Sequence, residues 1–418
     1  MPRAEFWKHV TTVLVGASGA QILPLLFAPL LTRMCTPDDM GAFSVWLGAI
    51  TVASIGATLR LDAAMILDHE ARQQRLCFGV VAYCATLLAL VLTLLLVAAH
   101  VLGVAPIRAM SWFELLTIGI GAWLMAAIQT TLAYATSHKL FDKAAKAKML
   151  QASTIALGQV ALLYAGLRGA ALMAGQLIGL GAGLAVAWLL LAPPTMRIGL
   201  RLDGEQRAYL VRHRAFWRFS LPSSLLNTVA GQLPLFLIGM THGAHAVGLF
   251  ALTQRVLSAP VSLIAASVLE VFKRQAVHDF ESLGHCRELY RATLRSLLVL
   301  ALGPTLILFV FAPDLFDWVF GPAWRPAGEL ARLLAPLCFC NFVAGPFGYV
   351  FAIAGRQKLE LFWQVAQFLM TFIMFSAPLS LRQSVLGYTI GGCLLCMAHL
   401  YLTYQSASGR INALNWPG

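Results

Sequence analysis

The stretch from Ala246 to Glu270, AVGLFALTQRVLSAPVSLIAASVLE, decides the fold of this chain. Its length fits a membrane-spanning helix, since about 20 residues at about 1.5 Å each cover a hydrocarbon core about 30 Å thick. Arg255 lies nine residues after Ala246, which puts it about 14 Å deep, close to the midplane. A charge there costs about 3 kcal/mol and usually faces a watery cavity or a partner. The stretch therefore predicts a spanning helix that carries a functional charge.

The composition of the whole chain agrees with a membrane protein. The 418 residues have a mean hydropathy of +0.76, with 59% hydrophobic and 11% charged residues. Soluble proteins carry about 25% charged residues. The apolar run that follows the basic N-terminus is too long for a cleaved signal peptide, so it is expected to be the first span. The formal charge of +12 indicates orientation in a membrane rather than nucleic-acid binding.

Windows without charges predict an all-α polytopic membrane protein with about twelve transmembrane helices. The connections between them are short, and the two longest, near 193–214 and 271–287, are too short for a folded domain. The predicted spans are 10–33, 40–67, 76–102, 111–136, 147–167, 170–192, 215–240, 246–270, 288–312, 327–354, 359–378 and 384–405.

Lysine and arginine in the connections predict the orientation. Of the 30 such residues, 22 fall on the side that holds both termini and 6 on the other, while Arg60 and Arg255 lie inside spans. Both termini are therefore expected in the cytoplasm.

A weak internal sequence repeat predicts two lobes of six helices. Gly41-Ala42-Phe43 opens the second predicted span and Gly248-Leu249-Phe250 opens the eighth, and prolines interrupt both the first and the seventh. An even number of helices per repeat gives halves of parallel topology. The arginine-rich connection near residue 200 is the expected boundary, so the lobes are predicted at 1–210 and 211–418.

Polar residues inside the spans are the candidate substrate-binding residues. Arg255 offers a permanent charge and forked donors that suit phosphate oxygens, although it could instead pair with a buried carboxylate. The remaining candidates are Arg60 and the amides Asn227, Gln232 and Gln254. The three amides could equally form hydrogen bonds between helices.

Asp62 is the candidate for cation coupling, because a carboxylate in a span could take up a proton or a sodium ion. Two residues apart on a helix, Arg60 and Asp62 are expected to point in different directions and not simply to neutralise each other. The alternative is that both reach toward the cytoplasmic surface near Asp68, Glu70 and Arg72.

The sequence predicts no catalytic residues, metal site or cofactor. It has no nucleotide-binding loop, no nucleophile elbow and no HExxH motif. The pairs Cys338/Cys340 and Cys393/Cys396 lie in apolar segments, where cysteine usually serves as a small hydrophobic residue.

Five runs of the sequence carry a family resemblance. The chain resembles bacterial polysaccharide-biosynthesis membrane proteins, the O-antigen and exopolysaccharide flippases of the multidrug/oligosaccharidyl-lipid/polysaccharide exporter superfamily. One departure is that Leu61 and Asp62 stand where relatives have an aromatic residue and a glutamate. The runs are VLVGASGAQILPLLFAPLLTRMCTPDDMGAFSVW (13–46), SLPSSLLNTVAGQLPLFLIG (220–239), VGLFALTQRVLSAPVSLI (247–264), VFGPAWRPAGELARLLAP (319–336) and AGRQKLELFWQ (354–364).

The resemblance implies a MATE-like, V-shaped transporter in the bacterial inner membrane, with a cationic cavity between its lobes. It implies a flippase that moves undecaprenyl-diphosphate-linked oligosaccharide repeat units from the cytoplasmic to the periplasmic leaflet by alternating access, coupled to a cation. The implied pathway is O-antigen, lipopolysaccharide or exopolysaccharide synthesis. The implied partners are the lipid-linked oligosaccharide, membrane lipids, a polysaccharide polymerase and a chain-length co-polymerase.

Two alternatives remain open. One is a polymerase or ligase acting on the same lipid, an enzyme that would want a sizeable periplasmic loop. The other is a MATE-type drug/cation antiporter, which would want a cavity dominated by carboxylates. Two arginines and one aspartate inside the spans favour an anionic substrate.

Overall fold

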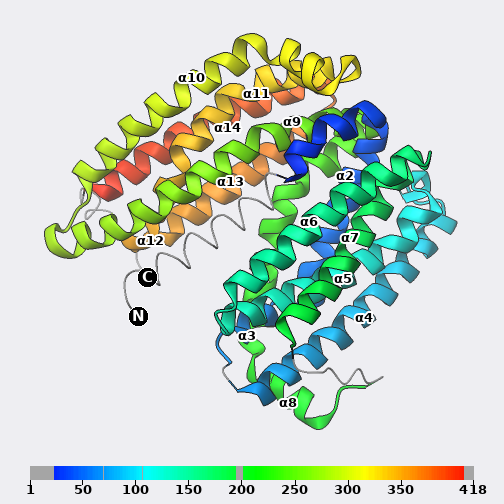
Figure 1. The fold of residues 1–418 in the computed structure, drawn as a ribbon. Coiled ribbons are helices and arrows are strands. Elements are labelled where there is room, and N and C mark those ends of the chain that lie inside the picture. Colours follow the sequence, from blue (N-terminus) through cyan, green and yellow to red (C-terminus); the bar gives the residue numbers. More distant parts are fainter. Residues whose placement is uncertain (1–22, 69, 106, 194–200, 409–418) are drawn as a thin grey trace. The chain divides into compact units, whose positions relative to one another are not determined.

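The computed structural model describes residues 23–68, 70–105, 107–193 and 201–408 (Figure 1). This part of the chain is helical and contains no strand. Residues 10–22 of the predicted span 10–33, both chain ends and residues 194–200 of the arginine-rich connection lie outside it. The chain forms two compact units, Met1–Phe236 and Leu237–Gly418. The predicted lobe boundary at 210/211 lies within the first unit.

The prediction of an all-α membrane protein with about twelve spans is confirmed. In the described ranges, nine helical stretches are long and apolar enough to cross a membrane. One of them, Phe216–Ser258, contains a non-helical residue at Gly243 and so holds two helices. With these two helices counted separately, the less apolar helix α6 and the shorter helix Leu23–Met34 bring the number of candidate spans in the described ranges to twelve.

The first unit consists of helices joined by short turns. Serine and threonine caps fix several helix starts: Thr36 accepts a hydrogen bond from the backbone of Asp39, and Ser111 from that of Glu114. Its elements are Leu23–Met34, α2 (Pro37–Thr58), α3 (Leu61–Met65), α4 (Ala71–Val101), η1 (Ile107–Ala109), α5 (Trp112–Ser137), α6 (Phe141–Tyr164), α7 (Arg168–Leu191), α8 (Gly204–Arg212), the π-helical turn η2 (Phe216–Ser220) and the start of α9 (Leu221–Leu283).

The predicted span 40–67 is not one helix. α2 ends at Thr58, and both Leu59 (φ 49°) and Arg60 (φ 58°) adopt the left-handed conformation before α3 begins. Such backbone is costly for residues with a Cβ and persists only where the surroundings hold it. The 22 residues of α2 already cover about 33 Å, so Arg60 lies at the end of this span.

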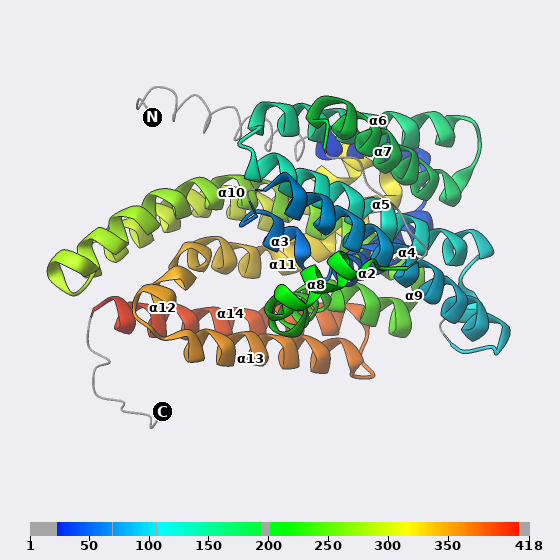
Figure 2. The ribbon, with the colours of Figure 1, turned by 90° about the horizontal axis from the view of Figure 1, so that it is seen from below.

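Glycines bring α6 and α7 into close contact, and the two helices run side by side in Figure 2. A Cβ at Gly175 would lie 2.6 Å from the backbone nitrogen of Gln159, and one at Gly179 would lie 2.7 Å from that of Ile155. Glycines four residues apart allow helix backbones to approach closely, which is how helices associate in a membrane.

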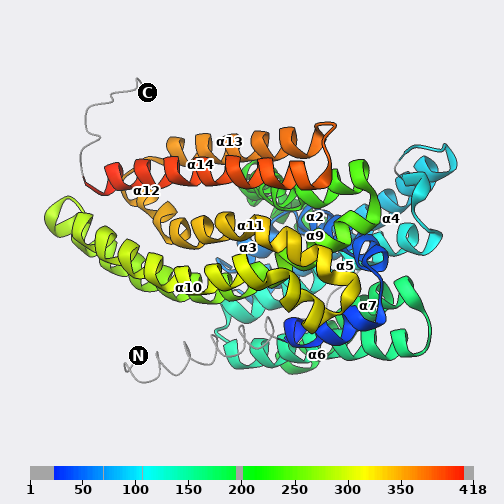
Figure 3. The same ribbon diagram turned by 90° about the horizontal axis from the view of Figure 1, so that it is seen from above.

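The second unit contains the rest of α9 and the later helices. Figure 3 shows α13 beside α14 and α10 beside α11, and both pairs are in contact. Its other elements are α10 (Arg287–Phe320), η3 (Pro322–Trp324), α11 (Arg325–Ala344), η4 (Gly345–Gly348), α12 (Tyr349–Ile353), α13 (Gln357–Ser376) and α14 (Leu381–Ala407).

One predicted boundary in this unit is wrong. The connection predicted at 271–287 is helical as far as Leu283, and only the turn around Gly284 (φ 72°) separates α9 from α10. The predicted span 327–354 agrees with the apolar stretch Pro322–Ile353, in which the turn η4 follows α11 at Gly345-Pro346. Charge-free windows report where a membrane core lies, whereas helices can continue into water.

Candidate functional site

Arg60 and Asp62 form an ion pair at the break between α2 and α3. The guanidinium Nη1 of Arg60 lies 3.4 Å from Oδ2 of Asp62, and the two side chains are 30% and 16% exposed. The expectation that these side chains point apart is wrong, because it assumed a continuous helix. The left-handed backbone at Arg60 turns its side chain toward the first turn of α3.

The pair is only partly satisfied. Nε of Arg60 and Oδ1 of Asp62 are both buried and have no hydrogen-bond partner among the described residues. An unmatched buried donor or acceptor costs about 1–3 kcal/mol, and more when the group is charged. One donor and one acceptor therefore remain for a ligand: the guanidinium suits an anion, and the carboxylate oxygen suits a proton or a cation.

A small apolar core holds the break in place. Leu61, Ala64 and Met65 of α3 are fully buried against Cys77 and Phe78 of α4. The thiol of Cys77 also lies 3.4 Å from the backbone oxygen of Leu61. This packing supports the strained backbone on which Arg60 and Asp62 sit.

The short helix α8 covers this core from the connection between the predicted lobes. Figure 1 shows α8 against the start of α4 and near α3. Tyr209 of α8 is 2% exposed, and its phenol donates a hydrogen bond of 2.7 Å to Oδ2 of Asp68. Nε2 of His213 lies 3.6 Å from Oδ1 of the same carboxylate. Burial raises the pKa of Tyr209 well above its ordinary value, so its hydroxyl remains a donor at neutral pH.

Gln74 extends this polar network to the end of α5. The side chain is 1% exposed, and its Nε2 donates to the backbone oxygen of Asp68 (2.9 Å) and to the hydroxyl of Ser137 (3.3 Å). Its Oε1 lies 2.9 Å from Nε2 of His138. The segment after α3 is thus tied to α4, α5 and α8, and Asp68 belongs to a packed network instead of a free surface.

The amide candidates of the first unit do not join the ion pair. Gln232 is half-buried beside Gly48, where an added Cβ would lie 3.1 Å from its Oε1. Asn227 is exposed. Neither makes a hydrogen bond with Arg60 or Asp62 in the part of the chain that the structure describes.

Arg255 and Gln254 lie on α9 in the second unit, and both are half-buried. The neighbouring hydroxyl of Thr253 is fully buried and donates 2.8 Å to the backbone oxygen of Ala327 on α11. This contact fixes the height and rotation of α9 on α11. Arg255 follows the kink at Gly243 by about 18 Å of helix, so it remains close to the middle of a membrane core.

Comparison with known proteins gives the family. The family of polysaccharide biosynthesis proteins matches residues 30–329, which is most of the chain. The chain belongs to this family.

Two curated relatives are similar to parts of the chain. Within this family, the chain is 30% identical over 151 residues to the teichuronic acid biosynthesis protein TuaB of Bacillus subtilis, covering 36% of this chain and 31% of TuaB. It is 21% identical over 163 residues to the amylovoran biosynthesis protein AmsL of Erwinia amylovora, covering 38% of this chain and 41% of AmsL. The chain thus spans well under half the length of each relative that it matches.

Solved structures place the fold of this family member among MATE transporters. The chain is similar to an inward-facing multidrug resistance MATE family transporter of the MOP superfamily, with a TM-score of 0.67, 15% identity and 96% of each chain covered. It is also similar to a MOP superfamily transporter from Pyrococcus furiosus described as having a binding pocket of reversed polarity, with a TM-score of 0.59, 16% identity and 96% of each chain covered. The predicted MATE-like fold is confirmed.

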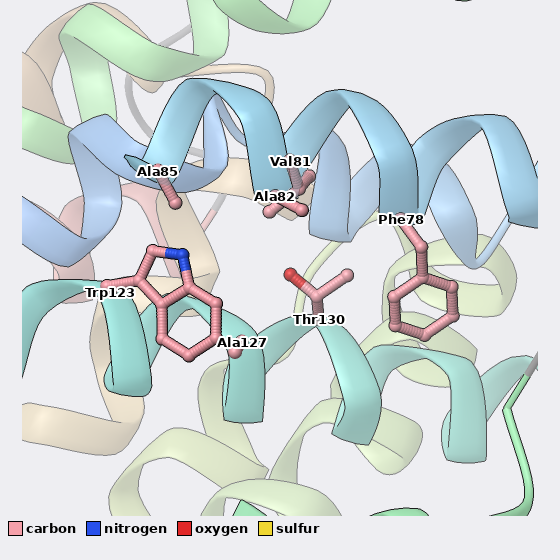
Figure 4. A pocket seen from close by; sticks show the side chains of 7 residues that line it. All are labelled: Phe78, Val81, Ala82, Ala85, Trp123, Ala127 and Thr130. Carbon is pink, nitrogen blue, oxygen red and sulfur yellow. The ribbon is translucent and has the colours of Figure 1, made fainter. Parts of the chain in front are cut away.

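A pocket elsewhere in the first unit of this polysaccharide biosynthesis protein does not suit a charged substrate. It opens between α4 and α5, where Trp123 and Thr130 face Phe78 and Ala85 (Figure 4). Thr130 is the one polar side chain apart from the indole of Trp123 among the residues that line it. The charged groups of the first unit's site lie at the helix break instead.

Sequence reasoning missed Asp68, Tyr209 and His213. Asp68 and Tyr209 are 141 positions apart, and no local pattern pairs residues at that distance. The helix α8 did leave a signal in the sequence: Asp203 and Gln206 have the spacing of a capping box, and the Gln206 side chain accepts a hydrogen bond from the backbone of Asp203.

Proposed function

We propose that this protein is a flippase that moves undecaprenyl-diphosphate-linked oligosaccharide repeat units from the cytoplasmic to the periplasmic leaflet by alternating access. The observation that carries the proposal is the partly satisfied pair of Arg60 and Asp62, which leaves a buried donor and a buried acceptor at a helix break. It occurs in a polysaccharide biosynthesis protein with a transporter fold.

The chemistry of the substrate explains why such a site is needed. The sugars and the diphosphate cannot enter about 30 Å of hydrocarbon unaided, while the polyprenyl tail can stay in lipid. A guanidinium binds phosphate oxygens through two parallel hydrogen bonds and keeps its charge at any depth. Arg60 at the end of the second span and Arg255 near the middle of the eighth are the residues assigned to the diphosphate. Asn227, Gln232 and Gln254 are assigned to the sugars.

Asp62 is assigned the coupling role. When a proton or a cation occupies its unpartnered oxygen, the carboxylate no longer attracts Arg60, and the guanidinium is released toward the diphosphate. The strength of this ion pair would then depend on both the cation and the diphosphate, because a ligand that binds either residue weakens the contact between Arg60 and Asp62. We further propose an inner-membrane location with both termini in the cytoplasm, and partnership with a polymerase and a chain-length co-polymerase.

Flipping can be tested directly with purified protein in liposomes. A fluorescent undecaprenyl-diphosphate disaccharide is placed in both leaflets, and an added membrane-impermeant quencher reports the accessible fraction over time. The wild type should expose the inner-leaflet lipid faster than empty liposomes, and Arg60→Gln should not. Equal rates for wild type, variant and empty liposomes would contradict the proposal.

A drug/cation antiporter is the second candidate, because multidrug transporters share the fold. The charged residues assigned to the site, Arg60 and Arg255 against Asp62, have a net positive charge, which favours an anionic substrate instead. In a deletion strain, the flippase predicts lost surface glycan and accumulation of the lipid-linked unit. Unchanged glycan with increased sensitivity to cationic dyes would favour the antiporter.

A further inference from the structure

Two arginines converge on one tyrosine where α10 begins and α14 ends. Nε of Arg287 donates to the phenol oxygen of Tyr404 across 3.0 Å, and Nη2 of Arg291 donates to the same oxygen across 2.6 Å. The two donor nitrogens are therefore no more than about 6 Å apart, a distance at which like charges repel each other appreciably.

The positive charge at this point is not matched within the protein. In the described ranges, neither Arg287 nor Arg291 forms an ion pair with a carboxylate. Glu288 in the first turn of α10 is exposed, and Asp279 accepts a hydrogen bond from Gln275. The carboxyl end of α14 offsets only about half a charge. Two guanidiniums thus share one neutral acceptor.

The backbone adds further donors on the same side. α10 is a 34-residue helix, and its N-cap, Cys286, supplies no side-chain hydrogen bond to the first turn. The N-terminus of a helix presents unpaired N–H groups and about half a positive charge, which favour an anion. The uncapped helix start and the arginine pair are independent features that attract the same kind of ligand.

The arrangement is rigid because a buried tyrosine joins the two helices just beneath it. Tyr290 is fully buried and stacks on Phe347, with 4.0 Å between ring centroids. Its hydroxyl lies 3.0 Å from the backbone oxygen of Leu400 and 2.9 Å from the hydroxyl of Thr403. The backbone N–H of Cys286 also donates to Ala407 across 3.0 Å. A site held by packing loses little entropy when a ligand binds.

We propose that Arg287, Arg291 and Tyr404 form a binding site for a lipid-borne phosphate group at the membrane surface, separate from the pair at Arg60 and Asp62. The phosphate takes the free N–H groups of both guanidiniums, and Tyr404 orients the two side chains through their shared contact with its phenol oxygen. Charge distribution predicts the cytoplasmic surface for this end of α10. The phosphate can belong to a bilayer phospholipid or to a polyprenyl diphosphate, since both present the same oxygens at the same depth.

The test uses the full-length protein in uncharged detergent, with bound lipid counted by native mass spectrometry. One arm compares phosphatidylglycerol with diacylglycerol, and the other compares undecaprenyl diphosphate with undecaprenol. Within each arm the two lipids differ chiefly in the phosphate group. Preference for the phosphate lipid in the first arm alone identifies a phospholipid, and in the second arm alone the carrier lipid. No preference in either arm overturns the proposal.

The variants separate a built site from a general positive surface. Arg287→Gln with Arg291→Gln should lower retention of the phosphate lipid about tenfold, because two charge-assisted contacts are lost. Arg291→Gln alone, at an exposed position, should lower it by less. Arg295→Gln is the matched control, since Arg295 lies on the same face one turn later and makes no contact with Tyr404 in the described chain. An equal loss with Arg295→Gln would overturn the proposal.

Discussion

The phenol of Tyr209 donates a 2.7 Å hydrogen bond to the carboxylate of Asp68, joining residues 141 positions apart. One lies in the connection between the predicted lobes, and the other follows the helix break that carries Arg60 and Asp62. The bond therefore attaches this connection, which is predicted to be cytoplasmic, to the frame of the candidate site. Because Tyr209 is nearly fully buried, this contact orders the segment between α3 and α4 as well as α8.

Tyr209→Phe should weaken the attachment of α8 without creating a cavity in the apolar core. The ring keeps its apolar contacts, while the partly buried carboxylate of Asp68 loses a donor at a cost of about 1–2 kcal/mol. Trypsin should then cleave at Arg207 and Arg212 in α8 roughly 5–30 times faster, because cleavage requires local opening. Arg72→Gln is the control, since its ion pair with Glu205 is exposed (66% and 60%) and contributes about 0–1 kcal/mol. Equal cleavage of Tyr209→Phe and wild type would refute the anchoring role.

The Arg60→Gly variant tests the role of the Arg60 side chain without the cost of its left-handed backbone. Glycine adopts φ near 58° freely, so this variant should reach the membrane at higher abundance than Arg60→Gln, which leaves Asp62 equally unpaired but keeps the backbone strain. If Arg60 binds the diphosphate, glycan output in a deletion strain should nevertheless be lost. Full glycan from Arg60→Gly would rule out the binding role.

Removing one member of the Arg60–Asp62 pair should cost more stability than removing both. Arg60→Gln strands a carboxylate that is 16% exposed, and Asp62→Ala strands a guanidinium that is 30% exposed. The double variant leaves neither charge unpaired, so a double-mutant cycle on thermal unfolding of the purified protein should give a coupling of about 1 kcal/mol. A coupling near zero would mean that the 3.4 Å contact contributes nothing to stability.

Variants of Arg255 should lose transport before they lose stability. Arg255→Lys should keep part of the glycan output, because lysine binds phosphate as a point charge. Arg255→Gln and Arg255→Ala should abolish it at unchanged membrane abundance, since removal of a charge near the midplane relieves an insertion cost of about 3 kcal/mol. Lost abundance would indicate a structural ion pair instead. Full glycan from the alanine variant would exclude Arg255 from the substrate site.

Gly179 and Gly181 offer a matched pair for the contact between α6 and α7. An alanine Cβ at Gly179 would meet the backbone of Ile155 at 2.7 Å, whereas one at Gly181 would meet nothing within 4 Å. Gly179→Ala should therefore push the helices apart and cost about 1–3 kcal/mol. Gly181→Ala should be neutral or stabilising. The measurement is the melting temperature of each purified variant compared with that of the wild type. Equal melting temperatures for the two variants would refute the close packing of α6 against α7 at Gly179.

The topology can be checked with a fluorescent protein that matures only in the cytoplasm. Inserted in the turn at His138–Leu140, between α5 and α6, it should fluoresce, and so should a fusion after Gly418. An insertion in the turn at Gly103–Ala105 should stay dark, because the charge distribution predicts that this turn is periplasmic. Fluorescence at Gly103 and none at His138 would invert the predicted orientation.

The sequence by itself determined the membrane character of the chain, the approximate spans and the presence of Arg255 deep in one of them. These features follow from hydropathy, which each segment carries within its own 20 or so residues. The family resemblance likewise rests on contiguous runs, and both the family and the MATE-like fold were confirmed.

Only the tertiary structure decided which polar groups meet. A hydropathy window treats residues 40–67 as one span, but the packing of α3 against α4 and α8 stabilises two left-handed residues that end α2 and turn Arg60 toward Asp62. The contact of Tyr209 with Asp68, and that of Arg287 and Arg291 with Tyr404, likewise join residues more than 100 positions apart. Their partners are chosen by the way helices pack, and no local pattern of the sequence encodes that choice.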